Sequence, residues 1–578
     1  MIEKQELLND LSEEQKDIVA FQGNSLLIAC PGSGKTRTLT HKLAYTSVCN
    51  PSSHKLNIAI TYTNREAKEI EERIDSMDID LSTIWTGTIH QFCMRFIIRP
   101  YAMYSDQLKK GYSIIDEFTK DEYAKSIADE LQIKVEPYDD LFANKDIVEA
   151  YNKLLISNKE IDFDMILKIS YSLLDSYRFI CENVSSVIDS IFVDEYQDTN
   201  KLQYLILAKI FKANSNIQLL FVGDPNQAIY GTLDGEAKNI DEIKSLYNTD
   251  FQLKSLTGCY RSTQRIVNLF KSFEIQNTGV KSVSKIKDEP GTIIYNAQVH
   301  KNELDDEIAK IIRLEIESGT PSEEICIVAP QWYDLFGISK KLREKIPDIS
   351  FDATYISPIK YDPLNPLCLI AQLLFMPDGH VLSVKKKIAN DFLTIIKEDL
   401  QINTPDTILD FDILTTINRC KKKELDGIIC FRNAIEQIFS LLKINIQIEK
   451  VLFDIQEQTF QKIKSRIEKY DLKTDYESMQ KYYGLKKGVV ISTIHGVKGQ
   501  EYTTVIAFGL LNGKLPHWNI ILKNDDTFQI NETKKLLYVL CSRAKKNLYL
   551  FSECGYTTKS GNPYSPTKQL CMIDWKKI

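Results

Sequence analysis

The sequence SLLIACPGSGKTRTLTHKLA, residues 25–44, determines how the rest of this chain is interpreted. Its first five residues form a short apolar run, which is typical of a buried β-strand. A glycine-containing loop follows, and the remaining residues have apolar side chains at helical spacing. A strand, a loop and a helix in this order predict an α/β domain built on a parallel sheet.

The loop ACPGSGKT matches the phosphate-binding pattern G-x-x-x-x-G-K-[ST], except that Ala29 stands in place of the first glycine. Gly32 and Gly34 allow backbone N–H groups to turn inward around phosphate oxygens. Lys35 would place a positive charge beside the β and γ phosphates, and Thr36 would bind Mg²⁺. A chance lysine in a glycine-rich turn is the alternative, and the flanking strand and helix argue against it. The predicted nucleotide-binding residues of this segment are Ala29, Cys30, Pro31, Gly32, Ser33, Gly34, Lys35, Thr36 and Arg37.

The segment SIFVDEYQDTN, residues 190–200, supplies the acidic groups that such a loop needs. An apolar strand places Asp194 and Glu195 at its carboxyl end. Asp194 can bind Mg²⁺, and Glu195 can orient and activate the attacking water. An acidic pair alone is weak evidence, but in one chain with Lys35 and Thr36 it predicts an ATP or GTP hydrolase.

The bulk properties exclude several classes of protein. A chain of 578 residues is too long for one hydrophobic core, so we expect three or four domains. The polar, acidic N-terminus is unlike a secretory signal, and no run of apolar residues is long enough to cross a membrane. The 12 cysteines include no C-x-x-C pair, which indicates reduced thiols and no structural zinc. We therefore expect a cytoplasmic protein with no membrane contact. A net charge of −7 argues against a uniformly positive surface, but it does not exclude a local nucleic-acid groove.

Strand-like and helical segments alternate in two separate parts of the chain. In the first part, LNIAITYT and STIWTGTIH follow the opening strand, and NIQLLFVGD comes later. In the second part, the strand-like runs are GTIIYNA, EEICIVAP, GVVISTIHG and TTVIAFG. A charged, helical stretch interrupts each part. The sequence therefore predicts two parallel-sheet domains, each with a mainly helical insertion.

Several short segments together resemble the UvrD/Rep/PcrA family of superfamily 1 DNA helicases. The most specific are VDEYQDTN and GDPNQAIYG. The other matching segments occur in the family's order: LSEEQKDIVAF, AITYTNREAKE, TGTIHQF, LTGCYRST, ISTIHGVKGQEY and ETKKLLYVLCSRAKKNL. Chance does not explain so many ordered matches spread over most of the chain, although the middle of each helical insertion matches poorly.

The resemblance implies an architecture and an activity. The family has two RecA-like domains, 1A and 2A, with the insertions 1B and 2B; ATP binds between the RecA-like domains, and single-stranded DNA crosses both. The expected domains are 1–105 and 181–257 for 1A, 106–180 for 1B, 258–374 and 486–578 for 2A, and 375–485 for 2B. The implied cofactors are ATP and Mg²⁺, and the implied substrate is single-stranded or tailed DNA.

The resemblance also assigns residues to the nucleotide. Gln15 resembles the residue that recognises adenine, Tyr260 the residue that stacks on it, and Glu501 the residue beside the ribose or phosphates. Arg261 and Arg543 resemble arginine fingers, which stabilise the charge that develops on the γ phosphate. Surface ion pairing is the alternative role for these two arginines.

Gln227 resembles a γ-phosphate sensor, and Tyr230 follows it in the same loop. We hypothesise that this loop links the nucleotide state to the grip on DNA. The candidate DNA-binding residues are Tyr62, Thr63, Asn64, His90, Tyr230, Thr493 and His495. Core packing is the alternative role for Tyr62, and a structural role is the alternative for the histidines.

The chain departs from its relatives at IYGTLDGEA, where they commonly have IYGWRGA or IYGFRGA. Thr232 replaces the aromatic residue and Leu233 replaces the arginine. Base–aromatic stacking contributes roughly 1–3 kcal/mol per base, so its loss should weaken the grip on DNA. The second helical insertion is shorter than 2B of the large relatives, and we expect no fused nuclease after the last motif.

These observations leave two main hypotheses. The first is an ATP-driven helicase or translocase that moves 3′ to 5′ on single-stranded DNA, with the polarity implied by the resemblance alone. The second is a DNA-sensing ATPase subunit, like GajB of the Gabija antiviral system, which activates a partner nuclease of the OLD/TOPRIM type. A third role, an ATP-independent DNA-binding remnant, conflicts with the presence of Lys35, Thr36, Asp194, Glu195, Gln227, Arg261 and Arg543.

Overall fold

The computed structural model divides the chain into two compact units. The first contains Met1–Phe92, Leu174–Ala353 and Lys486–Ile578, and the second contains Cys93–Leu173 and Thr354–Leu485. The predicted boundaries of 1A, 1B, 2A and 2B remain a prediction. The structure describes residues 4–49, 55–77, 79, 81–115, 117–134, 140–230, 235–352, 358–359, 365–376, 382–422, 425–470, 472–483, 488–522, 525–558 and 560–576.

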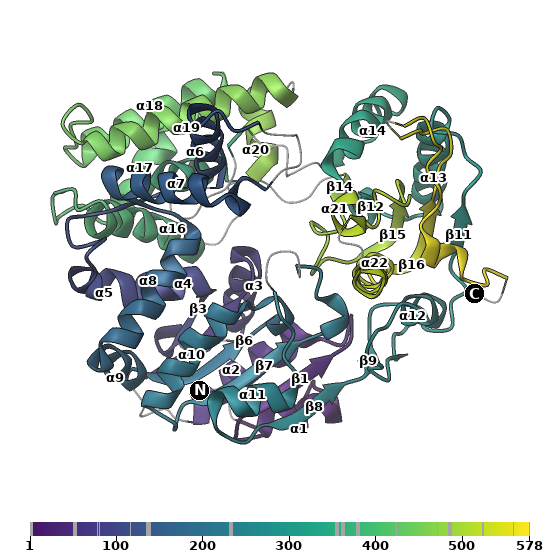
Figure 1. The fold of residues 1–578 in the computed structure, drawn as a ribbon, viewed down its shortest axis with the longest axis horizontal. Helices are drawn as coiled ribbons and strands as arrows, with labels where there is room; N and C mark the ends of the chain where they lie inside the picture. Colours follow the sequence, from purple (N-terminus) through teal and green to yellow (C-terminus); the bar gives the residue numbers. More distant parts are fainter. Residues whose placement is uncertain are drawn as a thin grey trace. The chain divides into compact units, whose positions relative to one another are not determined.

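The first unit contains a six-stranded sheet in the order β3-β2-β6-β7-β1-β8 (Figure 1). Every pairing in it is parallel. Its strands are β1 (Ser25–Ala29), β2 (Leu56–Thr61), β3 (Ile84–Thr88), β6 (Ile188–Val193), β7 (Gln218–Gly223) and β8 (Gln252–Leu256). Because the strands are parallel, the loops that follow β1, β6 and β7 meet at one edge of the sheet.

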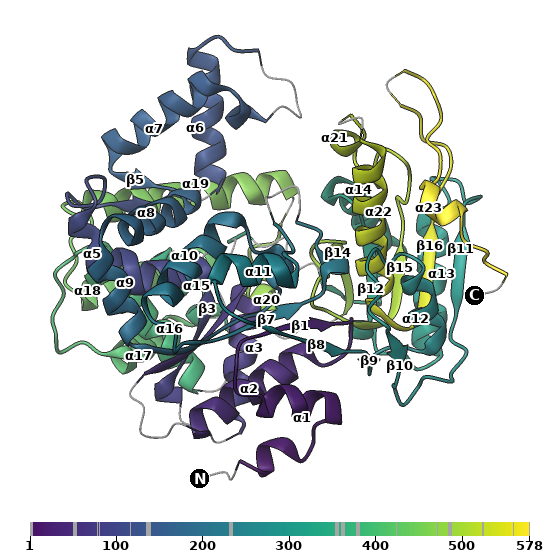
Figure 2. The same cartoon turned by 60° about the horizontal axis from the view of Figure 1, so that its bottom comes forward.

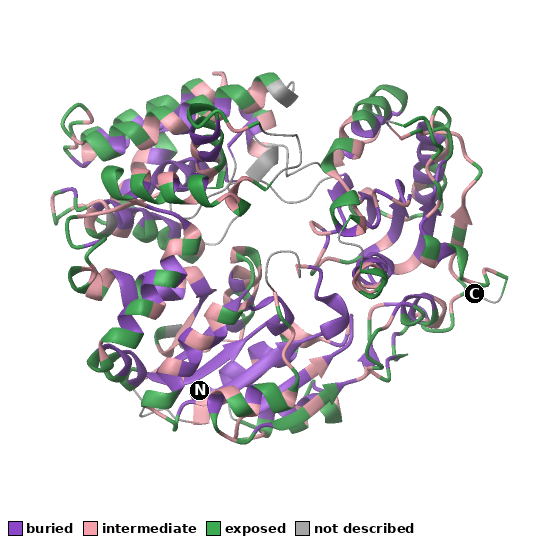
Figure 3. Cartoon of the chain, viewed as in Figure 1, coloured by how far each residue is buried: buried purple, intermediate pink, exposed green. Residues whose placement is uncertain are grey.

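Helices cover both faces of this sheet, which is why its strands are mostly apolar and buried (Figure 3). One group packs against one face and the second group against the opposite face (Figure 2). The first group is α1 (Glu13–Ala20), α2 (Lys35–Cys49) and α3 (Asn64–Asp75). The second group is α9 (Arg178–Ser186), α10 (Lys201–Ala213) and α11 (Ile240–Tyr247).

The same unit contains a second six-stranded sheet in the order β11-β16-β15-β12-β14-β13, again with parallel pairings throughout. Its strands are β11 (Ile293–Asn296), β12 (Ile325–Ala329), β13 (Phe351–Asp352), β14 (Val489–Thr493), β15 (Tyr502–Ala507) and β16 (Ala544–Phe551). The helices around it are α12 (Gln264–Lys271), α13 (Leu304–Glu317), α14 (Trp332–Lys345) and α22 (Asp526–Cys541). The predicted α/β fold with two RecA-like parallel sheets is confirmed.

The described residues of the second unit are mainly helical, with one short pair of parallel strands among them. Buried apolar side chains on its helices form a core of their own. Its elements are β4 (Ser113–Ile114), α6 (Glu117–Glu130), α7 (Lys145–Asn158), β5 (Glu160–Ile161), α15 (Pro366–Phe375), α16 (Leu382–Thr394), α17 (Asp410–Cys420), α18 (Gly427–Leu441), α19 (Lys450–Tyr470) and α20 (Tyr476–Tyr483). The remaining helices and strands of the two units are α4 (Ile89–Cys93), α5 (Arg99–Tyr101), α8 (Phe163–Ser176), β9 (Gly258–Cys259), β10 (Lys281–Ser282), α21 (Trp518–Ile521) and α23 (Lys568–Cys571). No helix in the described part of the chain is long and apolar enough to span a membrane.

A buried carboxylate fixes α13 against the second sheet. Glu315 is 5% exposed, and its oxygens accept hydrogen bonds from Tyr549 Oη at 2.8 Å, Thr504 Oγ1 at 2.7 Å and Asn547 Nδ2 at 2.9 Å. Thr320 Oγ1 adds a fourth bond at 3.2 Å. A buried polar group costs free energy unless it is hydrogen-bonded, so this network depends on all of its members.

We expect Glu315→Ala to destabilise the second sheet by about 3 kcal/mol or more, because it leaves several buried donors without an acceptor. Amide hydrogen exchange of β15 and β16 measures this locally, without assuming that a multidomain chain unfolds in one step. Glu317→Ala, at an exposed position of the same helix, is the control. Equal protection in the two variants would contradict the assignment.

Candidate active site

The phosphate loop joins β1 to α2 in the predicted strand–loop–helix arrangement. Gly32 and Gly34 have φ values of +71° and +80°, a region that favours glycine. Ser33 Oγ donates to the Cys30 carbonyl at 2.7 Å, and Ala29 is the last residue of β1. A Cβ atom at Gly32 would lie 2.6 Å from Arg261 Cβ, so the loop is packed tightly against the segment that carries this arginine.

Charged side chains from the loops after β1, β6 and β7 converge at this edge of the first sheet. Lys35 Nζ lies 2.9 Å from Glu195 Oε1, and both side chains are largely buried. Although burial works against the charged ammonium, Glu195 and Asp224 raise the pKa of Lys35 above its usual value. Despite its own burial, Glu195 has its pKa held below the usual value by Lys35 and Lys498. Both groups therefore remain ionised at neutral pH.

Gln197 holds Glu195 in place, and sequence reasoning missed it. Its Nε2 donates to Glu195 Oε2, and its Oε1 accepts from the Asp224 backbone N–H at 3.0 Å. Glu195 has a φ of +50°, which is uncommon for a residue with a side chain, and such strain is typical of functional sites. A Cβ at Gly223 would lie 2.0 Å from Gln197 Oε1, so β7 must end in glycine. The only sequence signal for Gln197 is its place within VDEYQDTN.

The donor set fits a magnesium ion. Burial, followed by the nearby charge of Glu195, raises the pKa of Asp194, so a cation beside Asp194 would favour its charged form. Asp194 and Thr36 offer carboxylate and hydroxyl oxygens, the ligand types that Mg²⁺ prefers. Among the described residues, no group of three or more His, Cys, Asp or Glu side chains could hold a metal ion. Mg²⁺ needs only one or two protein ligands when phosphate and water oxygens complete its coordination shell.

The residues predicted for the adenine side lie against the phosphate loop. Gln15 is 4% exposed and caps α1 with Ser12, while its Nε2 donates to the Ser33 carbonyl at 3.2 Å. Tyr260 is 48% exposed, and its backbone N–H donates to the Gly32 carbonyl at 2.8 Å. Arg37 is exposed and donates to the Asp10 carbonyl at 2.9 Å. Gln15 therefore already uses both ends of its amide within the protein.

The two sheets of the first unit contact each other through Gln227 and Arg543. Gln227 Oε1 accepts from Arg543 Nη2 at 2.9 Å, and Gln227 Nε2 donates to Asp224 Oδ2 at 2.8 Å. Arg543 is 2% exposed, so it is not a surface ion-pair residue. Burial, followed by the nearby charge of Arg261, lowers the pKa of Arg543 to about 9, which still leaves it charged at neutral pH.

Arg261 lies beside Arg543 and is held within the second sheet domain. Its Nε donates to Glu501 Oε2 at 2.6 Å, and its Nη1 donates to the Ser542 carbonyl at 2.8 Å. Arg543 Nη2 also donates to Ser542 Oγ at 2.9 Å. Arg261 therefore packs against the phosphate loop at Gly32, whereas Arg543 contacts Gln227 in the loop after β7.

Lys498 forms a second link between the two sheets. No role was predicted for it from the sequence. Its ammonium pairs with Asp198, and it donates to the Gln227 carbonyl at 2.8 Å. It also lies 5.0 Å from the centre of the Tyr230 ring. The sequence signal was present, because Lys498 lies within ISTIHGVKGQEY, but only the fold shows what it contacts.

Three of the predicted DNA-binding side chains lie together. The Tyr62 and Tyr230 rings stack with their centres 4.7 Å apart, and His495 lies 5.6 Å from Tyr230. Tyr62 is 37% exposed, so it is not a core residue. These three residues follow β2, β7 and β14, which explains how they meet. We refer to Tyr62, Tyr230 and His495 as the aromatic column.

The other predicted DNA-binding residues have local roles as well. Thr63 caps α3 through a reciprocal pair of bonds with Glu66, and Asn64 is the first residue of that helix. Thr493 Oγ1 accepts from the Gly496 N–H at 3.1 Å. His90 is half-buried in α4, directly after β3. Thr232 and Leu233, the departures from the family pattern, lie outside the described residues.

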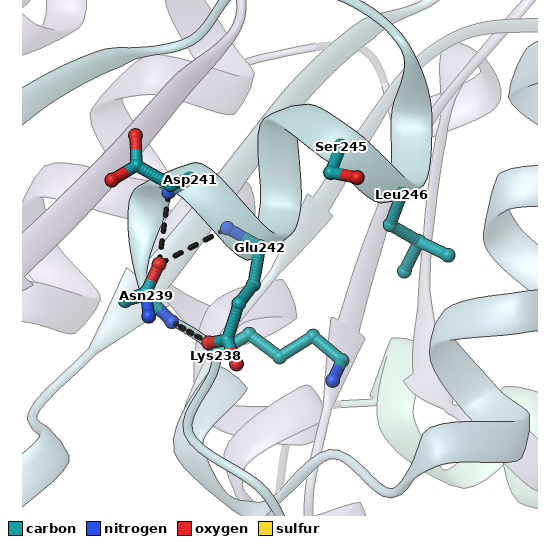
Figure 4. Close-up of a pocket in the computed structure, with 6 residues that line it drawn as sticks. All are labelled: Lys238, Asn239, Asp241, Glu242, Ser245 and Leu246. Carbon is teal, nitrogen blue, oxygen red and sulfur yellow. Dashed lines mark hydrogen bonds between the residues drawn. The ribbon is translucent and has the colours of Figure 1, made fainter.

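A pocket of about 510 Å³ lies elsewhere in the first unit, at the start of α11 (Figure 4). Asn239 Oδ1 accepts from the backbone N–H groups of Asp241 and Glu242, both at 3.0 Å, and Glu242 accepts from the Asn239 N–H at 2.7 Å. These bonds form a helix capping box. None of the predicted site residues lines this pocket; its lining residues are Lys238, Asn239, Asp241, Glu242, Ser245 and Leu246.

Comparison with known proteins agrees with this geometry. Residues 11–143 and 134–248 match the UvrD/REP helicase N-terminal domain, and residues 390–554 match the UvrD-like helicase C-terminal domain. The chain belongs to the UvrD/REP helicase family. The ATP-dependent DNA helicase PcrA of Bacillus subtilis is 26% identical over 629 residues, covering 94% of this chain and 83% of that protein. PcrA of Staphylococcus epidermidis is 23% identical over 625 residues, and PcrA of Staphylococcus aureus is 24% identical over 626, with the same coverage.

Proposed function

We propose that this chain hydrolyses ATP while bound to single-stranded DNA, and that it uses the energy to translocate 3′ to 5′ and unwind duplex DNA. The contact between Gln227 and Arg543 is the main support for this proposal, because it joins a loop of the first sheet to the last helix-to-strand turn of the second. A nucleotide at the phosphate loop would therefore act on both sheets at once. Family membership and the named activity of the PcrA relatives add support.

The hydrolytic step depends on Lys35, Glu195 and Gln197. When ATP enters, the ammonium of Lys35 turns from Glu195 to the phosphates, which offer a larger negative charge. Glu195 remains ionised and held by Gln197, so its carboxylate can orient a water and accept its proton. Thr36 and Asp194 would hold Mg²⁺, which when bound neutralises charge on the phosphate oxygens. Arg261 and Arg543 complete the site by stabilising the γ phosphate in the transition state.

The loop from Gln227 to Tyr230 provides the coupling to DNA. Gln227 contacts Arg543 at the nucleotide end, and Tyr230 stacks in the aromatic column three residues later. Lys498 contacts both the Gln227 carbonyl and the Tyr230 ring. A shift of Gln227 on nucleotide binding is therefore passed to side chains proposed to contact DNA bases. Conditional closure of this kind is how a bound nucleotide can drive movement.

A second candidate function is a DNA-sensing ATPase that activates a partner nuclease of the OLD/TOPRIM type in a Gabija-like antiviral complex. The specific observation in its favour is Thr232, which stands where the relatives carry a base-stacking aromatic residue. A motor with weaker stacking would grip DNA less firmly, and a sensor has less need of that grip.

Gln227→Ala should leave ATP affinity unchanged but reduce DNA-stimulated hydrolysis about 10- to 100-fold, because a hydrogen bond to a buried guanidinium is lost. Nucleotide titration and steady-state ATPase assays with and without single-stranded DNA measure the two effects separately. Gln252→Ala, at an exposed residue of β8, is the matched control. Equal stimulation by DNA in the Gln227 variant and the unaltered chain would contradict the coupling role.

Strand displacement distinguishes the two candidate functions. The purified chain should unwind a duplex with a 3′ single-stranded tail when ATP and Mg²⁺ are present, and it should leave a 5′-tailed duplex intact. Lys35→Ala should abolish unwinding, because the phosphates lose their cation. ATP hydrolysis without unwinding of either duplex would favour the regulatory subunit. Absence of any DNA-stimulated hydrolysis would contradict both functions.

A further inference from the structure

Arg261 forms an ion pair with Glu501 inside the protein. Its Nε donates to Glu501 Oε2 at 2.6 Å, and its side chain is 10% exposed. A guanidinium paired with a carboxylate has less positive charge to offer a phosphate, because its field is largely cancelled at short range. The availability of Arg261 therefore depends on how strongly Glu501 holds it.

Glu501 is itself shared with a second cation. Its Oε1 lies 3.6 Å from Lys545 Nζ, while its Oε2 accepts from Arg261. Lys545 Nζ in turn lies 3.0 Å from Glu324 Oε2 and 3.3 Å from Glu324 Oε1. Glu324 is anchored by Thr503, whose backbone N–H and hydroxyl both donate to it at 3.0 Å. Four charges of alternating sign thus form a chain, which we call the charge relay: Glu324, Lys545, Glu501 and Arg261.

We propose that Lys545 and Glu324 are positioning residues that set how tightly Glu501 holds Arg261, and hence how readily Arg261 reaches the terminal phosphate of ATP. This inference rests on the proposed function, because it assigns Arg261 to the phosphate. Neither residue touches the nucleotide in this account. Their effect passes through Glu501 alone.

The alternating order of the charges gives the two residues opposite effects. Lys545 attracts Glu501 and so weakens its hold on Arg261; removing Lys545 leaves Arg261 as the main partner of Glu501. Glu324 competes with Glu501 for Lys545; neutralising Glu324 frees Lys545 to attract Glu501 and so releases Arg261. A role in stability alone predicts no such difference in sign, because both changes break the same ion pair.

The expected effects are modest because water screens this chain of charges. The side chains of Lys545, Glu324 and Glu501 are 26%, 33% and 45% exposed. Ion pairs at this degree of exposure change an equilibrium about twofold to fivefold. The same exposure means that losing the Lys545–Glu324 pair should cost the fold little.

The neighbouring residue Lys546 provides a matched control. It also lies on β16 and also forms an ion pair, with Glu289 at 2.6 Å. Successive side chains of a strand point to opposite faces, so Lys546 points away from Glu501. Lys546→Ala removes the same charge from the same strand but leaves the charge relay intact.

The test compares the unaltered chain with Lys545→Ala, Lys545→Arg, Glu324→Gln, Lys546→Ala and the double variant Lys545→Ala/Glu324→Gln. The first readout is the affinity for a non-hydrolysable ATP analogue relative to ADP, which reports how well the protein senses the terminal phosphate. The second is the single-turnover rate of ATP hydrolysis on single-stranded DNA. Lys545→Ala should lower both about twofold to fivefold, and Glu324→Gln should raise both by a similar factor.

Three further results are expected. Lys546→Ala should change neither readout. Lys545→Arg keeps the positive charge, so both readouts should stay close to those of the unaltered chain. Glu324→Gln should have no effect in the double variant, because its influence passes through Lys545. The proposal is overturned if Lys545→Ala and Glu324→Gln shift the analogue-to-ADP ratio in the same direction, or if Lys545→Ala matches Lys546→Ala. Failure of the proposed function is a separate result: the unaltered chain would bind the analogue without hydrolysing ATP, and the affinity ratios would still decide the role of the charge relay.

Discussion

The burial of the Arg543 guanidinium is the constraint on which the arrangement of the first unit depends. A buried arginine keeps its charge, so its N–H groups must find acceptors. They find the Val539 carbonyl, the Gln500 carbonyl and Ser542 Oγ within the second sheet domain, and Gln227 Oε1 from the first. One donor is thus satisfied only when the two sheets are together. Any motion of one sheet domain against the other must break or replace that bond.

The same edge of the first sheet brings three carboxylates close to Lys35, and Mg²⁺ bound with a nucleotide would compensate their charge. Asp194, Glu195 and Asp224 face Lys35, and burial together with Glu195 raises the pKa of Asp194. Mg²⁺ would compensate the carboxylates, and the phosphates would then take up Lys35 and the two arginines. The backbone of the proposed nucleotide site is therefore already in place, whereas its ion pairs would have to change when ATP binds. Lys35 is paired with Glu195, and Arg261 is paired with Glu501. ATP would have to replace these carboxylates as the partner of each cation.

The residues proposed to sense the nucleotide and to contact DNA share one short loop in this molecule. Gln227 and Tyr230 belong to the segment after β7, and Lys498 from the second sheet contacts both ends of it. The ion pair between Lys498 and Asp198 places that lysine next to the segment that carries Glu195. In this account, the coupling needs no long pathway. It needs only that a few buried polar contacts have two alternative sets of partners.

The sequence alone determined the fold class, the phosphate loop with Lys35 and Thr36, the acidic pair Asp194 and Glu195, and the family. These features follow from local rules: apolar runs form strands, glycines permit the loop's backbone, and parallel strands bring their carboxyl ends to one edge. Only the tertiary structure revealed the contacts of Gln197, Lys498 and Lys545, and the use of the Gln15 amide within the protein. Their contacts depend on backbone geometry and on residues hundreds of positions away, such as the 316 that separate Arg543 from Gln227. Periodicity and motif spacing carry no information about such distances, because side-chain packing decides which distant polar groups can satisfy one another.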